Sequence, residues 1–461
     1  MTKIFIHSMP ATGHINPMAV IVKSLVFDHK FECVWYSLEI FKEIIERAGA
    51  EFRSLESELS EFKLDFPPNK RSFRVGKLLN LLLDLAEKNS IKIAKDINTD
   101  KPDLIIIDPP SYHAKLAFRY YDIHYEMKNT NNKRNDSQFS PLSQLPPIMC
   151  YETSFATEKD LFPNQEEQEL MFNLSFYEKF RCFSSLILPA IRAMRLSKQF
   201  GINFVFPLTE IFMMNPEKKI VTIYPIIQPR NHLFNSNTKF IGACIDDEIR
   251  NNEVNEELQI ILEKFNEINS MEVNQKKNYL IYVALGTVFY ENISLYSKII
   301  QSLELIEKQM IDKKFNFIIA AGKTQTKLKE KFKNLPSNIL ICKTVPQLEI
   351  LKIASLFITH CGMNSMNEAI YYGVPCVCIP LNADQPVIAQ RASKEFKMGI
   401  SLDFVTMKPL DIKNAVISIL TDDSYREKAL DLSIKCKKIN GKHEGVKEIL
   451  NFLQTKSKSF E

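Results

Sequence analysis

Short apolar runs alternate with amphipathic stretches from the first residues of the chain onward. Near the N-terminus, KIFIHS, FECVWYS and DLIIID are apolar runs of strand length, whereas INPMAVIVKSLVF and LEIFKEIIERAG have helical periodicity. Strands that lie between two layers of helices are buried on both faces, so they read as continuous apolar runs rather than as alternating ones. The first half of the chain therefore predicts an α/β domain with a parallel, doubly wound sheet.

The same pattern starts again in the second half of the chain. NYLIYVALGT, NFIIAAG, NILICK, SLFITH and PCVCIP are further short apolar runs, and a helical stretch follows each of them. Two polar segments interrupt the series: residues 127–147 are Asn-rich and predict a surface insertion, and residues 246–278 are charged and helical. We therefore expect a first domain at residues 1–242, a linker at 243–278, a second domain at 279–440 and a final helix at 441–461.

The composition of the chain indicates which classes of binding partner and which cellular compartment to expect. A net charge of +4 spread over 461 residues predicts no polyanion partner such as a nucleic acid. The nine scattered cysteines have neither a disulfide framework nor metal-ligand spacing, which favours a reducing compartment. No basic leader with an apolar core follows Met1, and no apolar run approaches the ~18 residues of a membrane span. We therefore expect a cytoplasmic protein without a membrane span.

The most informative chemistry lies where the run SLFITH meets the helical stretch MNEAIYYG. His360, Gly362, Asn364 and Ser365 surround the start of this predicted helix, and Glu368 follows one turn later. Small and hydroxyl side chains at such a turn expose backbone N–H groups, and the helix dipole adds positive potential, which together favour an anion. The Glu368 carboxylate can accept from a ribose diol. The strand PCVCIP leads to Asp384 and Gln385, which can bond sugar hydroxyls.

These motifs resemble the signature of the family 1 UDP-glycosyltransferases. The chain is most similar to the macrolide-glycosyltransferase branch, whose version reads close to WVPQLEIL…THGGMNS…EA…GVP…P…ADQP. The resemblance implies a GT-B architecture, in which two Rossmann-like domains face each other across a cleft and the last helix returns to the first domain. It also implies donor-binding roles for Val345, Gln347, Gly286 and Thr287, beside the residues of the motif itself.

Two first-domain residues match the catalytic pair of this family. His14, in GHINP, corresponds to the general base that takes a proton from the acceptor hydroxyl, and Asp108, after DLIIID, to the aspartate that orients it. Taken alone, His14 could be a residue at a helix start without a catalytic task, and Asp108 could cap the next helix. His113 lies near this pair but outside the motif, and we expect it on a helix surface.

The sequence departs from the family pattern at the position that would contact the base of the nucleotide. Thr344 stands where the family usually has a tryptophan that stacks on uracil, and the only tryptophan of the chain is Trp35 in the first domain. A threonine cannot provide base stacking, so either another group covers the base, the donor affinity is lower, or the nucleotide differs. Gln385 resembles the ending of the motif in glucose-type enzymes. Ala243 replaces a proline that the family has near the linker.

The leading hypothesis is an inverting, metal-independent glycosyltransferase without a cofactor. It would move a hexose from a UDP-sugar to a hydroxyl of a small lipophilic acceptor, and we expect it to act as a monomer. The alternatives are a nucleotide-sugar epimerase on the same fold and a binding protein that has lost turnover. The Phe-rich helices at residues 150–213 form either an apolar acceptor pocket or core.

Overall fold

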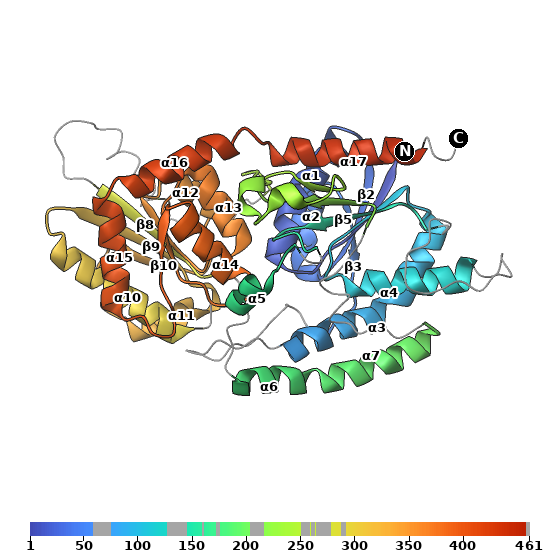
Figure 1. Cartoon of the computed structure of the whole chain (residues 1–461), viewed down its shortest axis with the longest axis horizontal. Helices are drawn as coiled ribbons and strands as arrows, with labels where there is room; N and C mark the ends of the chain where they lie inside the picture. Colours follow the sequence, from blue (N-terminus) through green and yellow to red (C-terminus); the bar gives the residue numbers. More distant parts are fainter. Residues whose placement is uncertain are drawn as a thin grey trace.

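The computed structural model has two α/β domains side by side, with both chain termini at the first domain (Figure 1). The residues that the structure describes are 1–58, 75–126, 145–158, 161–171, 176–202, 216–249, 259, 263, 278–286 and 292–457. The predicted insertion at 127–147 lies outside them except for residues 145–147. The same holds for most of the predicted linker helix at 246–278.

The first domain is built on a seven-stranded sheet in the order β3-β2-β1-β4-β5-β6-β7. Every neighbouring pair of strands in it is parallel. All four residues of β4 are buried, as its continuous apolar sequence predicts. The strands are β1 (Lys3–His7), β2 (Glu32–Ser37), β3 (Glu51–Ser54), β4 (Leu104–Ile107), β5 (Ile148–Glu152), β6 (Lys218–Val221) and β7 (Thr238–Phe240).

Helices cover both faces of this sheet. On one face both α3 and α4 pack against the strands, and Phe118 of α4 joins Phe5 of β1 and Leu85 of α3 in one core cluster. The helices are α1 (Thr12–Phe27), η1 (Glu39–Phe41), α2 (Lys42–Arg47), α3 (Val75–Asp100), α4 (Tyr112–Tyr121), η2 (Asp122–Glu126), α5 (Gln165–Met171), α6 (Phe176–Ser185), α7 (Ile187–Phe200), η4 (Pro225–Ile227) and η5 (Asn231–Leu233).

The second domain repeats the plan with a six-stranded parallel sheet in the order β10-β9-β8-β11-β12-β13. Its strands are β8 (Asn278–Ala284), β9 (Lys314–Ala320), β10 (Ile339–Cys342), β11 (Leu356–Thr359), β12 (Cys376–Cys378) and β13 (Gly399–Ser401). Its helices are α10 (Ile293–Gln309), η6 (Gly322–Thr324), α11 (Gln325–Lys331), α12 (Gln347–Ile353), α13 (Met363–Tyr372), α14 (Gln385–Gln390), η7 (Arg391–Glu395), α15 (Pro409–Thr421) and α16 (Ser424–Cys436).

The last helix, α17 (Gly441–Ser457), returns to the first domain and lies along α1 (Figure 1). Val446 and Ile449 join Ile21 in the core cluster of that domain. The chain crosses its own backbone closely at the start of the helix, because a Cβ on Gly441 would lie 2.3 Å from the carbonyl oxygen of Ala243. Within the described ranges, no helix combines the length and apolarity needed to cross a membrane.

Candidate active site

A histidine and an aspartate meet at the carboxyl edge of the first sheet. Strands β1 and β4 are parallel neighbours with His7 opposite Ile107, so the residues that follow them reach the same edge. His14 lies in the first turn of α1, and its Nδ1 is 2.8 Å from Oδ2 of Asp108. The aspartate is fully buried, whereas the histidine side chain is 25% exposed. Because a carboxylate only accepts, Nδ1 of the neutral ring carries the proton and Nε2 keeps its lone pair.

Three donors fix the Asp108 carboxylate. Beside His14, the Met9 N–H donates to Oδ2 at 2.8 Å, and the Ser111 hydroxyl donates to Oδ1. Ser111 is fully buried and immediately precedes α4. The sequence motif missed Ser111, although a serine between a buried strand and a helix is a recognisable helix-start signal. The Tyr151 hydroxyl donates to the His14 carbonyl at 2.8 Å and helps to hold the turn.

The surface position predicted for His113 is wrong. His113 is 1% exposed, and Ser90 of α3 donates to its carbonyl. Its ring is 5.8 Å from that of His7, which in turn stacks on Tyr36 at 4.7 Å. Burial lowers the pKa of His113 to about 4 and the pKa of His7 well below its ordinary value. Both rings are therefore neutral at pH 7, and neither adds positive charge behind Asp108.

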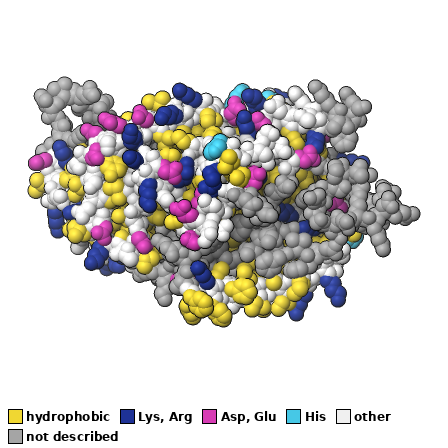
Figure 2. Space-filling view, in the orientation of Figure 1, with side chains coloured by type: hydrophobic (Ala, Val, Ile, Leu, Met, Phe, Trp, Pro, Cys, Tyr) yellow, Lys and Arg dark blue, Asp and Glu magenta, His cyan; other side chains and the backbone are white. Residues whose placement is uncertain are grey.

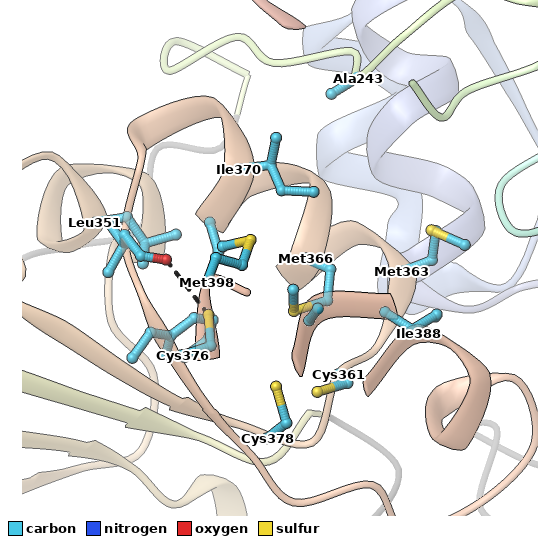
Figure 3. Close-up of a cluster of buried hydrophobic side chains, with 14 of the residues drawn as sticks. Ala243, Leu351, Cys361, Met363, Met366, Ile370, Cys376, Cys378, Ile388 and Met398 are labelled. Carbon is cyan, nitrogen blue, oxygen red and sulfur yellow. Dashed lines mark hydrogen bonds between the residues drawn. The ribbon is translucent and has the colours of Figure 1, made fainter. Parts of the chain in front are cut away.

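The turn between β11 and α13 closes tightly around His360. A Cβ on either Gly286 or Gly362 would lie 2.5 Å from His360 Nε2, so a side chain at either position would displace the imidazole ring. Gly286 also has a φ of +78°, which disfavours any other residue there. Cys361 has a φ of +63° and turns its side chain into the core beneath α13, beside Cys378 (Figure 3). Burial lowers the pKa of His360 to about 4. Near pH 7 the imidazole is therefore a neutral hydrogen-bond donor rather than a cation.

The start of α13 touches the turn that carries His14. Asn364 Nδ2 donates to the carbonyl of Gly13 at 2.8 Å, across 351 positions of sequence. Ser365 follows on the same turn of the helix, with its Oγ 3.5 Å from Gln347 Nε2. The positive end of α13 and the histidine–aspartate pair, which come from different domains, therefore lie at one interface.

Glu368, buried one turn inside α13, pairs with Gln347 at the start of α12. Glu368 is 2% exposed and accepts from Gln347 Nε2, while Gln347 Oε1 accepts from the Tyr282 hydroxyl at 2.9 Å. Val345, two residues before Gln347, is buried as well, whereas Thr344 is exposed. The amide of Gln347 thus holds the carboxylate in place, and Thr344 offers only a small side chain beside it.

Asp384 and Gln385 are fixed by different partners. Asp384 accepts through Oδ2 from the hydroxyl of Ser154, which follows β5 of the first domain. Burial raises the pKa of Asp384, and the bond from Ser154 opposes that rise. Gln385 Oε1 accepts from the N–H groups of Leu381 at 2.8 Å and Asn382 at 3.0 Å. The loop therefore occupies the amide oxygen of Gln385, and its amide nitrogen is the group left for a ligand.

Known proteins with similar sequences are UDP-glucosyltransferases and glycosyltransferases by name. The profile described as UDP-glucoronosyl and UDP-glucosyl transferase matches residues 274–438. The uncharacterized UDP-glucosyltransferase YojK of Bacillus subtilis is 24% identical over 466 residues, covering 100% of this chain and 99% of that protein. The NDP-glycosyltransferase YjiC of Bacillus licheniformis is 26% identical over 454 residues, covering 98% of this chain and 97% of its own. These matches support the resemblance to the UDP-glycosyltransferases.

Two solved structures share the fold of this chain. The glycotransferase of kitacinnamycin has a TM-score of 0.70 at 18% identity and covers 98% of this chain and 99% of its own. Os79 from O. sativa has a TM-score of 0.64 at 16% identity, and the match covers 98% of this chain and 100% of Os79. The fold is GT-B, as the sequence predicted. A rabbit UDP-glucuronosyltransferase, 2B16, matches over only 22% of this chain, so the full-length bacterial matches support the resemblance to the macrolide-glycosyltransferase branch.

The predicted site residues that the structure describes come from both domains and lie near the domain interface. Thr287 lies outside the described residues, so its position is not part of the site described above. No sequence motif indicates Ser154, which bonds to Asp384 across 230 positions and the domain interface. The carbonyl of Gly13 was missed for the same reason, since a backbone oxygen carries no signature in sequence.

Proposed function

We propose that this UDP-glycosyltransferase is an inverting enzyme that transfers a hexose from a UDP-sugar to a hydroxyl of a small lipophilic acceptor. The observation that carries the proposal is the pair of His14 and Asp108, bonded at 2.8 Å, next to the start of α13. The bond from Asn364 to Gly13 supports this juxtaposition of a base with an anion site. A general base and a leaving-group site are the two elements that a single displacement requires.

The proposed reaction is one displacement at the anomeric carbon. Nε2 of His14 takes the proton of the acceptor hydroxyl while the acceptor oxygen forms its bond to that carbon. The bond from the carbon to the β-phosphate oxygen breaks, and its electron pair leaves with UDP. His14 becomes an imidazolium, and the Asp108 carboxylate stabilises it without taking the proton. Attack from the face opposite the leaving group inverts the configuration of the sugar carbon.

Second-domain residues would hold the leaving diphosphate. The backbone N–H groups at the start of α13, the hydroxyl of Ser365, the amide of Asn364 and the neutral ring of His360 are donors of the kind that bind phosphate. These donors can stabilise the developing charge, so we propose that no metal ion and no cofactor take part. Thr287 stays a predicted phosphate contact that follows Gly286 in the chain.

The remaining contacts to the UDP-sugar are proposed from the same sequence motif. Glu368, held by Gln347, would accept from the ribose hydroxyls, and the backbone at Val345 would meet the edge of the base. Asp384 and the amide nitrogen of Gln385 would bond the hexose. The O. sativa relative of the same fold was solved with UDP and with a trichothecene, which supports uridine and a lipophilic acceptor for this chain. Both halves of the site come from one chain, so the monomer is the proposed active unit.

A donor and acceptor panel tests the proposal. Purified protein is incubated with UDP-glucose, other UDP-sugars and TDP-sugars, each with a set of lipophilic alcohols and phenols, and products are read by mass spectrometry. The proposal predicts a hexosyl adduct of at least one acceptor together with free UDP. A sugar that changes configuration while still attached to its nucleotide would instead indicate an epimerase. Donor binding without any product from the full panel would indicate a binding protein.

A further inference from the structure

Helices α6 and α7 follow one another along the edge of the first domain, outside α3 (Figure 1). Their inner face is core: Leu196 and Phe200 of α7 are buried with Leu79 and Leu82 of α3. Their outer face is apolar as well but faces solvent, and it is visible as a band of hydrophobic atoms along this edge (Figure 2). We call this face the outer stripe; it includes Phe176, Phe180, Phe183, Ile187, Leu188 and Met194.

The outer stripe is continuous over both helices. Phe176, Phe180, Phe183 and Ile187 are four, three and four positions apart, which is the spacing of one helix face. Phe176 is 89% exposed, Leu188 73% and Phe183 71%. Single exposed apolar side chains are common, but a contiguous row of large ones on a monomer marks an interaction surface. The stripe does not hold the fold together, because the inner face makes the contacts with α3.

Basic side chains border the stripe. Residues 176–200 contain five Lys or Arg residues and one carboxylate. Arg192 is turned inward and pairs with Glu87 of α3. Lys179 and Arg181 are exposed on α6, and the Arg181 guanidinium lies 5.9 Å from the ring centre of Tyr177.

The remaining two cations, Arg195 and Lys198, are exposed at the far end of α7. Large apolar side chains on one helix face with cations beside them are the features of a helix that lies in the interface of an anionic membrane. A second copy of the chain is a poorer occupant, since stacking two such stripes would bring their cations together.

We propose that the outer stripe docks this protein on the surface of a membrane that contains anionic lipid. The aromatic and aliphatic side chains would enter the boundary between head groups and acyl chains, and the basic side chains would meet lipid phosphates. The inference rests on this surface alone and is independent of the proposed transferase activity. It would hold the first domain against the lipid layer while the second domain stays in solution.

Vesicle sedimentation tests this docking. The full chain is mixed with vesicles of phosphatidylcholine alone or with about 30% phosphatidylglycerol, at low and high salt. We expect binding to the anionic vesicles, a fall of at least fivefold in the partition coefficient on neutral ones, and weakening by salt. The double variant Phe180→Ser, Leu188→Ser should lose at least tenfold. Exposed apolar residues of the second domain provide the matched control, Ile311→Ser with Ile434→Ser, which should bind like wild type.

Charge and self-association give two further readouts. Arg195→Gln with Lys198→Gln should weaken binding to anionic vesicles at least fivefold and leave thermal stability unchanged, because both residues are exposed. Absence of wild-type binding to anionic vesicles would overturn the proposal, as would equal binding by the Phe180 and Leu188 variant. A dimer in analytical ultracentrifugation that this variant converts to monomer, without vesicle binding by wild type, would assign the stripe to a second copy instead.

Discussion

Replacing Asp108 by asparagine removes one negative charge while it keeps the shape of the side chain. Oδ2 accepts from His14 and from the Met9 N–H, and Oδ1 accepts from Ser111. If the amide oxygen takes the position of Oδ2, the first two bonds survive, and Ser111 can turn its hydroxyl to accept from the amide nitrogen. His14 then keeps its orientation and its tautomer. What is lost is the attraction between the carboxylate and the imidazolium that forms during transfer.

The size of that loss follows from the kind of hydrogen bond that remains. A hydrogen bond to a charged group contributes roughly 1.5–3 kcal/mol and a neutral one roughly 0.5–1.5 kcal/mol. The difference of roughly 1–1.5 kcal/mol corresponds to about a tenfold lower kcat. The imidazolium exists only after proton transfer begins, so the donor dissociation constant should change by less than about twofold. Turnover is measured by mass spectrometry at saturating donor, and donor affinity by calorimetry.

Asp103→Asn is the matched control for this variant. Asp103 is exposed just before β4, where it accepts from the Lys3 N–H, so the same change of charge there should leave turnover as in wild type. An unchanged kcat for Asp108→Asn would refute the orienting and charge-stabilising role. A collapse of donor affinity with kcat maintained would make Asp108 part of the donor site instead.

Three further changes test other parts of the site. Glu368→Ala should raise the calorimetric dissociation constant of UDP about tenfold or more, because ribose loses a charged acceptor; an unchanged affinity would contradict its role. Thr344→Trp should tighten UDP binding by about fivefold through stacking on uracil, and weaker binding by a folded variant would mean that another side chain covers the base. The pKa of His113 is about 4 in the folded protein and roughly 6.5 in the unfolded chain. The stability that its neutral ring contributes is therefore fully present above pH 6.5, and the free energy of unfolding falls by roughly 3 kcal/mol as the pH drops through 4. His113→Gln should flatten the fall in unfolding free energy between these pH values, and an unchanged slope would contradict the assignment.

Local sequence was sufficient to predict the strands and the strand–turn–helix unit that contains His360 and Glu368. A run such as DLIIID is buried on both faces of a parallel sheet, so its apolar sequence alone indicates β4. His360, Gly362, Asn364 and Glu368 all lie within nine consecutive positions of one strand–turn–helix unit. Once the strand and the helix are recognised, backbone geometry brings these residues together without further information.

Contacts between distant parts of the chain could not be predicted in this way. His113 has the sequence surroundings of an exposed helix residue, but tertiary packing buries it, with its ring near that of His7 in β1 and its carbonyl bonded to Ser90 of α3. The bonds from Ser154 to Asp384 and from Asn364 to Gly13 depend on how two domains meet, so local sequence does not indicate which residues pair.

The sequence allowed two interpretations of the Phe-rich helices at residues 150–213, an apolar acceptor pocket or part of the core. Their periodicity does not say which apolar face meets α3, and the outer stripe fits neither alternative.

The most direct test of the account is single-turnover transfer by wild type and by His14→Ala with the same UDP-sugar and acceptor. If His14 is the general base, the variant should lose roughly 10²–10⁴-fold in rate. Its donor affinity should stay close to wild type, because Nε2 acts on the acceptor and not on UDP. A variant that keeps more than about a third of the wild-type rate would contradict general-base catalysis by His14 and with it the proposed mechanism.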